Sequence, residues 1–205
     1  MTNAQQPSIQ HLLQTLCPDG VPYATLGEVC NFQRGSTITA KDARKGEIPV
    51  IAGGQKPAYY HDQANRKGES ITIAGSGAYA GFVAYWITPI WVSDAFTISF
   101  KDTENNSTKY LFYFLKNIQE RIYSTKKGSG VPHVHPSSID HFSIPLPPLP
   151  IQERIVEILD KFSRLSAELE AELELRKKQY DFYRNRLLSF DSNSDTNTTK
   201  HYHKG

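Results

Sequence analysis

The sequence predicts an α+β protein, in which a globular mixed α/β domain of short strands and loops precedes one long coiled-coil-forming α-helix. Three observations predict it. Up to residue 144, short runs of strand-type residues alternate with turn residues, and four prolines then fall within residues 145–150. Residues 151–189 contain neither Pro nor Gly. A length of 205 residues suits one domain of moderate size with an appendage.

The chain is expected to begin with a helix over residues 8–17. Ser8 is available as its N-cap, and the turn residues 17–20 end it. A second helix start is expected at Thr25, because Thr25 and Glu28 have the spacing of a capping box. The apolar residues of the first helix recur at helical spacing: Ile9, Leu12, Leu13 and Leu16.

Short strands make up most of the next part of the chain. They are predicted at residues 48–52, 70–74, 81–88, 90–92, 95–100 and 142–146. Residues 70–93 carry no charge and are long enough to span a membrane. Glycines, Pro89 and alternating β-branched and aromatic residues favour buried strands there instead, so no membrane partner is expected.

A helix is predicted over residues 108–123. It places five apolar side chains on one face: Leu111, Phe112, Leu115, Ile118 and Ile122.

Beyond the prolines, residues 151–189 form a helix roughly 57 Å long at ~1.5 Å per residue. Its apolar residues follow a heptad-like pattern with one stutter between Leu169 and Leu173. Eight acidic and eight basic residues balance its charge. Such a helix is too long for one small domain to cover, so its apolar stripe needs another helix, from this chain or a second copy.

Charge and cysteine content exclude several classes of protein. The net charge of +2 excludes a uniformly basic nucleic-acid coat, so any basic surface must be local. Two cysteines are too few for a disulfide scaffold. Residues 1–10 lack the features of a signal peptide, and a cytoplasmic location is expected.

Signatures of catalysis are missing. There is no phosphate-binding P-loop, and the Gly-Ser-Gly triplets are too short for a dinucleotide fingerprint or a nucleophile elbow. His133, His135 and His141 could form a metal site with Cys17 or Cys30, but neither cysteine has the spacing of a structural zinc pair. Loop histidines that pack or touch phosphate are the favoured interpretation. We therefore predict no catalytic residue and no metal site.

Basic residues cluster on two loop regions, where they interleave with Gln, Ser and Tyr. Such residues can contact phosphate and read base edges, although on composition alone ordinary solvated charges fit equally well. The candidate DNA-binding residues are Arg34, Lys41, Arg44, Lys45, Gln55, Lys56, Tyr59, Tyr60, Arg66, Lys67, Ser76, Tyr79, Lys126 and Lys127.

Four stretches resemble the specificity subunits of type I restriction–modification systems: residues 13–21, 26–30, 128–139 and 144–160. The most specific is the join Pro-Pro-Leu-Pro-x-Gln-Glu-x-Ile at residues 147–155. In that family a proline-rich exit leads from a target-recognition domain into a long spacer helix. The likeness covers about residues 12–188.

The resemblance implies a non-catalytic subunit with no cofactor of its own. Such subunits usually carry two target-recognition domains and two antiparallel helices, and each domain reads one half of a bipartite site in double-stranded DNA. Methyltransferase subunits holding S-adenosylmethionine clamp around them, and restriction subunits add translocase and nuclease activity.

This chain departs from the family in length, because it has one such domain and one helix. We expect a target-recognition domain at 1–148, a spacer and dimerisation helix at 149–190 and a disordered tail at 191–205. The alternatives are a truncated longer chain, a coiled-coil interaction module that binds no DNA, and a fragment of a fused restriction–methyltransferase enzyme. Residues expected to join two copies are Ile151, Ile155, Ile158, Phe162, Leu165, Leu169, Leu173, Tyr180, Tyr183 and Leu187.

Overall fold

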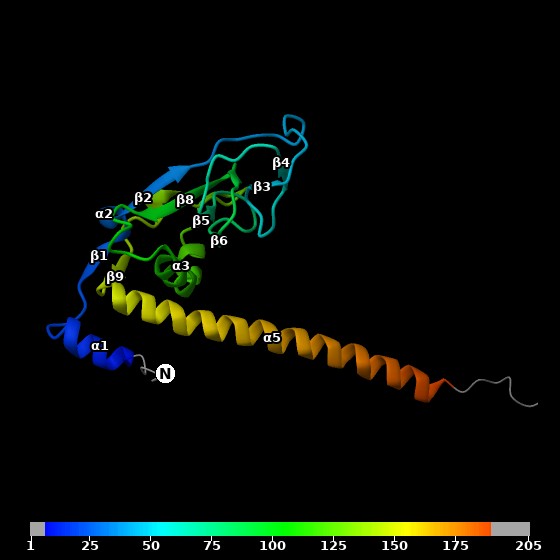
Figure 1. Ribbon diagram of the computed structural model, residues 1–205. Helices are drawn as coiled ribbons and strands as arrows, with labels where there is room; N and C mark the ends of the chain where they lie inside the picture. Colours follow the sequence, from blue (N-terminus) through cyan, green and yellow to red (C-terminus); the bar gives the residue numbers. More distant parts are fainter. Residues whose placement is uncertain (1–6, 190–205) are drawn as a thin grey trace, which may run out of the picture. The chain divides into compact units, whose positions relative to one another are not determined.

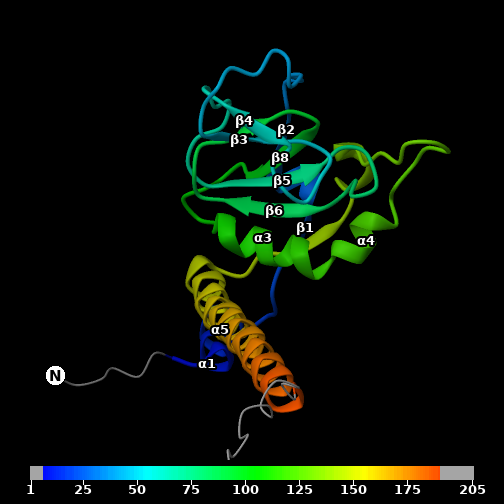
Figure 2. The same ribbon diagram turned by 90° about the vertical axis from the view of Figure 1, so that its right-hand side faces the viewer.

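The computed structural model describes residues 7–189 and is shown from two sides in Figures 1 and 2. It confirms the predicted α+β class, with small sheets and short helices followed by the long helix α5. The chain divides into two compact units, Met1–Ile158 and Leu159–Gly205, so the boundary lies within α5. The tail predicted at 191–205 lies outside the described residues.

Both predicted helix starts near the N-terminus are confirmed. Helix α1 (Ile9–Leu16) follows Ser8, whose Oγ accepts a hydrogen bond from the His11 N–H at 3.2 Å. Helix α2 (Leu26–Val29) has the full capping box. The Thr25 N–H donates to Glu28 Oε2 at 2.7 Å, and the Glu28 N–H donates to Thr25 Oγ1 at 3.3 Å.

A four-stranded antiparallel sheet forms the centre of the first unit. Its order is β2 (Cys30–Arg34), β8 (Ala95–Phe100), β5 (Ser70–Ala74) and β6 (Val83–Trp86). Every residue of β5 is buried, as expected for a strand covered on both faces. Residues 70–93, which could have formed a membrane helix, thus lie in strands and turns, and no described helix is long and apolar enough to cross a membrane.

A smaller sheet lies beside it, in the order β4 (Tyr59–His61), β3 (Ile48–Ile51) and β7 (Trp91–Val92). Strand β3 pairs antiparallel with β4 and parallel with β7. The sequence did not predict β2, β4 or β1 (Tyr23–Thr25). These strands are short, and each pairs with a strand that only the tertiary fold brings near, except for the local pair β3–β4.

The third pairing closes the domain where the chain enters and leaves it. Strand β1 runs antiparallel to β9 (Ser143–Pro145), with Ala24 opposite Ile144. The Tyr110 hydroxyl donates to the Pro145 carbonyl at 2.9 Å, and burial raises the pKa of this hydroxyl to about 12.

The single helix predicted over residues 108–123 is wrong in one respect, because the chain forms two helices. Helix α3 (Thr108–Asn117) ends at Ile118, whose φ of −98° and ψ of 18° leave the helical range, and α4 (Gln119–Tyr123) follows. The break places the Gln119 amide against the start of β6, where it accepts from the Val83 N–H at 3.0 Å and donates to the Gly81 carbonyl at 2.7 Å. A buried backbone pair at the edge of the sheet is satisfied in this way.

The main core lies between the four-stranded sheet and helices α3 and α4, which lie along the β6 side of the sheet in Figure 2. Leu111, Leu115 and Ile122 are fully buried there, as the predicted apolar face requires. A 3₁₀ turn at Pro136–Ser138 precedes β9.

Helix α5 runs from Leu149 to Leu188, close to the predicted range. Its first turn belongs to the core of the first unit, where Ile151 and Gln152 are completely buried. Pro150 is tolerated because it lies in the first turn, where the missing N–H has no intrahelical acceptor.

Candidate nucleic-acid interface

The candidate residues of the first basic cluster lie on the loops around the smaller sheet. Arg34 ends β2, and Lys41, Arg44 and Lys45 lie on the loop from β2 to β3. The turn between β3 and β4 carries Gln55 and Lys56, Tyr59 and Tyr60 belong to β4, and Arg66 and Lys67 follow β4.

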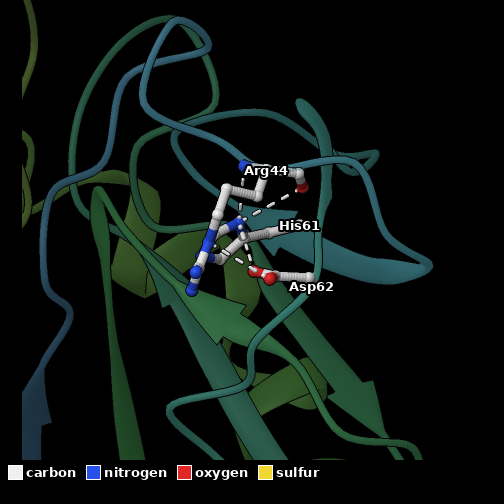
Figure 3. A network of polar contacts seen from close by, with 3 residues as sticks. All are labelled: Arg44, His61 and Asp62. Carbon is white, nitrogen blue, oxygen red and sulfur yellow. Dashed lines mark hydrogen bonds and ion pairs between the residues drawn. The ribbon is translucent and has the colours of Figure 1, made fainter.

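A polar network holds the long loop against β4 (Figure 3). The Arg44 N–H donates to Nδ1 of the buried His61 at 3.0 Å, and Arg44 Nε lies 3.1 Å from Asp62 Oδ2. The His61 ring also packs edge-on against Trp91, with 5.1 Å between ring centroids. Because the Arg44 side chain is 63% exposed, its pairing with Asp62 is weak, and a phosphate can compete for the guanidinium.

Two candidates of this cluster hold the protein's own backbone. The Tyr59 hydroxyl donates to the Ile38 carbonyl. The Arg66 guanidinium donates to the carbonyls of Asn65 at 2.8 Å and Arg34 at 2.9 Å and to Thr97 Oγ1 at 3.2 Å, and burial lowers its pKa. Their polar atoms therefore help to position loops, and the contact of these two residues with DNA stays a prediction. Tyr60, by contrast, is 55% exposed.

The second cluster joins three segments that are distant in sequence. Lys127 and Ser76 each form a β-bridge with His133. Lys126 Nζ donates to the Ala78 carbonyl at 3.0 Å and lies 4.4 Å from the centre of the Tyr123 ring. The exposed Tyr79 belongs to the same loop as Ser76. The Lys126 side chain thus has partners within the protein, whereas Lys127 is held through backbone hydrogen bonds with His133.

A cleft of about 270 Å³ is lined by Arg34 of the first cluster and by His133, which pairs with Ser76 and Lys127 of the second. Gly35, Thr37 and the chain around His133 and His135 also line it. The two imidazole rings are stacked, with 6.0 Å between centroids and 4° between planes. Gly75 and Asp94 also line the cleft.

The sequence did not identify Thr37 or Asp94 as site residues, and for His133 and His135 it favoured packing or phosphate contact over metal binding. Their neighbourhood arises from backbone pairing between remote segments, such as the Gly77 N–H with the Pro132 carbonyl at 3.0 Å. The pattern of residue types along the chain does not predict which remote segments pair.

Within residues 7–189, no group of three His, Cys, Asp or Glu side chains could hold a metal ion. Burial raises the pKa of the Cys30 thiol to about 12, so this side chain remains protonated. His141 lies apart from the other two histidines, with Nδ1 3.6 Å from Asp140 Oδ1.

The first two of the predicted dimerisation residues are covered by the domain of the same chain. Ile151 is fully buried and Ile155 packs on the core of the first unit, so both are taken up by the domain itself. Ile158 is half-buried. From residue 161 onward the described helix is exposed, and its apolar side chains are 50–71% accessible: Phe162, Leu165, Leu169, Leu173, Tyr180, Tyr183 and Leu187.

The glutamine of the proline-rich join, Gln152, makes three hydrogen bonds inside the domain. Its Oε1 accepts from the Ser107 N–H at 2.9 Å, and its Nε2 donates to Asn106 Oδ1 and to the Pro147 carbonyl, each at 2.9 Å. Ser107 is the N-cap of α3. One buried amide therefore connects the first turn of α5 to the start of α3 and to the proline segment.

Comparison with known proteins covers both the domain and most of the helix. Residues 18–175 match the family described as type I restriction modification DNA specificity domain. A putative type I specificity subunit of Mycoplasma pneumoniae, S.MpnORF285P, is 31% identical over 192 residues, which cover 88% of this chain and 62% of the relative. The EcoR124I/EcoR124II specificity subunit of Escherichia coli is 40% identical over 189 residues, which cover 83% and 45%.

Solved structures agree in fold. The S subunit of a type I restriction-modification system from M. genitalium aligns with a TM-score of 0.64 at 21% identity, covering 84% of this chain and 47% of that one. The HsdS subunit of Thermoanaerobacter tengcongensis aligns with a TM-score of 0.58 at 19% identity, covering 86% and 49%. The chain thus spans about half the length of most of these proteins.

Proposed function

Because the chain belongs to the family of type I restriction–modification DNA specificity domains, we propose that it is a non-catalytic subunit that reads one half of a bipartite site in double-stranded DNA. The observation that carries the proposal is the continuous match over residues 18–175, which includes the domain, the proline-rich join and most of the described helix. A match to the domain alone would leave the helix unexplained.

The candidate interface supports DNA as the ligand of the domain. Its basic side chains gather on loops, although residues 1–150 as a whole carry only 13 basic against 11 acidic residues. Loop cations position a protein on phosphates, and polar groups between them read base edges. The proposed contacts are Arg34, Lys41, Arg44, Lys45, Gln55, Lys56, Tyr59, Tyr60, Arg66, Lys67, Ser76, Tyr79, Lys126 and Lys127.

The helix supports association with a second copy. An apolar stripe that is half or more exposed over seven positions, from Phe162 to Leu187, is costly in water unless another helix covers it. A twofold dimer would present two identical domains, and its DNA site would be a palindrome with two half-sites.

The remaining partners follow from the family. The dimer would scaffold methyltransferase subunits, which supply S-adenosylmethionine and the chemistry of methylation, and restriction subunits. This assembly would act in the cytoplasm, where its DNA substrate lies.

Expression with type I methyltransferase subunits from the same organism, in a host that lacks DNA methylation, tests the function. Sequencing of methylated adenines should reveal one motif that appears only when this chain is present. Co-purification without sequence-dependent methylation would favour a plain interaction module. Absence of both association and methylation would refute the assignment.

A further inference from the structure

An exposed carboxylate lies among the basic residues of the cleft. Asp94 follows the buried Ser93 and precedes β8, so its position is set by two strands of the folded domain. Arg34, His133 and His135 line the same cleft as Asp94. If this surface only tracked phosphates, an acidic group here would weaken binding by repulsion.

The carboxylate retains capacity to accept hydrogen bonds. Ser76 Oγ donates to Asp94 Oδ2, and in the described part of the chain Asp94 has no ion pair. An ionised carboxylate has about four acceptor sites, so one hydroxyl leaves most of them for a ligand. The Ser76 bond also restricts the rotamer of the side chain, which suits a group that reads a fixed partner.

Gly75, which has no side chain, lines the cleft beside Asp94. A Cβ built on Gly75 would lie 3.2 Å from Asp94 Oδ1 and 3.3 Å from the Asp94 carbonyl oxygen. Such a methyl group would crowd the carboxylate on the side of the cleft. Glycine therefore leaves Oδ1 open to a ligand that enters there.

We infer that Asp94 determines specificity by accepting a hydrogen bond from the exocyclic amino group of a base in the major groove. Cytosine N4 and adenine N6 are the amino donors exposed there. In the proposed complex Arg34, His133 and His135 contact nearby phosphates, and the Asp94 carboxylate contacts a base edge. This inference rests on the proposed function, because it names what one part of the DNA-binding surface reads.

The test compares methylation motifs of the complex with its methyltransferase subunits, carrying either the natural chain or a variant. Asp94→Ala should leave the motif unchanged except at one position in each half-site, where discrimination falls roughly tenfold to a hundredfold. Asp94→Asn keeps the shape and the Ser76 contact but adds an N–H donor, so the same position should relax or change its preferred base. A G·C pair at that position identifies cytosine, and an A·T pair identifies adenine.

Glu69→Ala is the matched control, since it removes an exposed carboxylate just before β5, outside the residues that line the cleft. It should preserve the whole motif. Unchanged motifs for both Asp94 variants, or an equal loss of methylation at every site by folded variants, would overturn the inference. If the natural chain itself yields no motif, the proposed function fails, and that result is distinct from either outcome.

Discussion

The two units of the chain differ in the exposure of their apolar side chains. In the first unit Ile71, Ile73 and Ile98 are 0–1% exposed, and the strands and helices around them enclose a core. In the second, every described residue from 161 to 189 is exposed, including leucines that are 50–71% accessible. The domain therefore buries its own apolar side chains, whereas the helix leaves its apolar side chains exposed, and under the proposed function a second copy covers them.

The largest expected effect comes from charging the stripe. The double change Leu165→Asp and Leu169→Asp would place two carboxylates in a buried helix contact, and the dimer dissociation constant should rise about a thousandfold or more, roughly 4 kcal/mol. Analytical ultracentrifugation measures it. Leu175→Asp is the control, because Leu175 is also exposed, at 65%, but lies off the heptad-like stripe. An equal loss from the control would show that the stripe is not the contact.

The second-largest expected effect concerns the contact between the domain and the first turn of α5. Gln152→Leu removes a buried amide with three hydrogen-bond partners and leaves the Ser107 N–H and the Pro147 carbonyl without theirs. We expect the domain to lose about 2–4 kcal/mol of unfolding free energy, measured by urea denaturation followed through tryptophan fluorescence. Exposed Gln179→Leu on the same helix should cost almost nothing. If the two variants unfold alike, Gln152 does not connect the domain to α5.

A smaller change concerns DNA binding by the second basic cluster. Lys126→Gln with Lys127→Gln should weaken binding of the assembled complex by about 1–2 kcal/mol and reduce the salt slope by up to about 1.8, if both contact phosphates. Fluorescence anisotropy at several salt concentrations measures both quantities. Because Lys126 already donates to Ala78, the single change at Lys127 should account for more of the effect. An unchanged affinity and slope would remove the pair from the interface.

The smallest expected effect is the pH dependence of one helix cap. Hydrogen bonds from the Thr25 N–H and hydroxyl lower the pKa of Glu28. Since the folded state favours the ionised form, this stabilisation is present above the unfolded pKa and is lost as the pH falls through the folded one. Glu28→Gln should therefore be less stable than the natural chain at pH 7 and equal to it in strong acid. A difference that persists in acid would assign the loss to packing.

The elements that the sequence predicted are those whose own residue types indicate burial. The strands Ser70–Ala74 and Ala95–Phe100 were predicted with their observed bounds, because both are uncharged runs rich in β-branched or aromatic residues next to turn residues. Strand Cys30–Arg34 was not predicted. Three of its five residues are exposed and polar, and its pairing with Ala95–Phe100 depends on the tertiary fold.

The same limit applies to the candidate site. Basic loop residues could be named from the sequence, but their roles depend on contacts between distant segments. Arg66 holds the carbonyls of Asn65 and Arg34, and Asp94 reaches Ser76 across 18 positions of sequence. Residue type alone cannot separate a cation that supports a loop from one that is available to a ligand.

The mass of the purified chain in solution tests the central claim most directly, since that claim is that a complete domain is joined to a helix that needs a partner. One copy has a mass of 23.1 kDa, so twice that value, about 46 kDa, is expected for the dimer. Multi-angle light scattering should give the larger mass at micromolar concentrations and above. A mass of one copy at the highest concentrations would contradict the account.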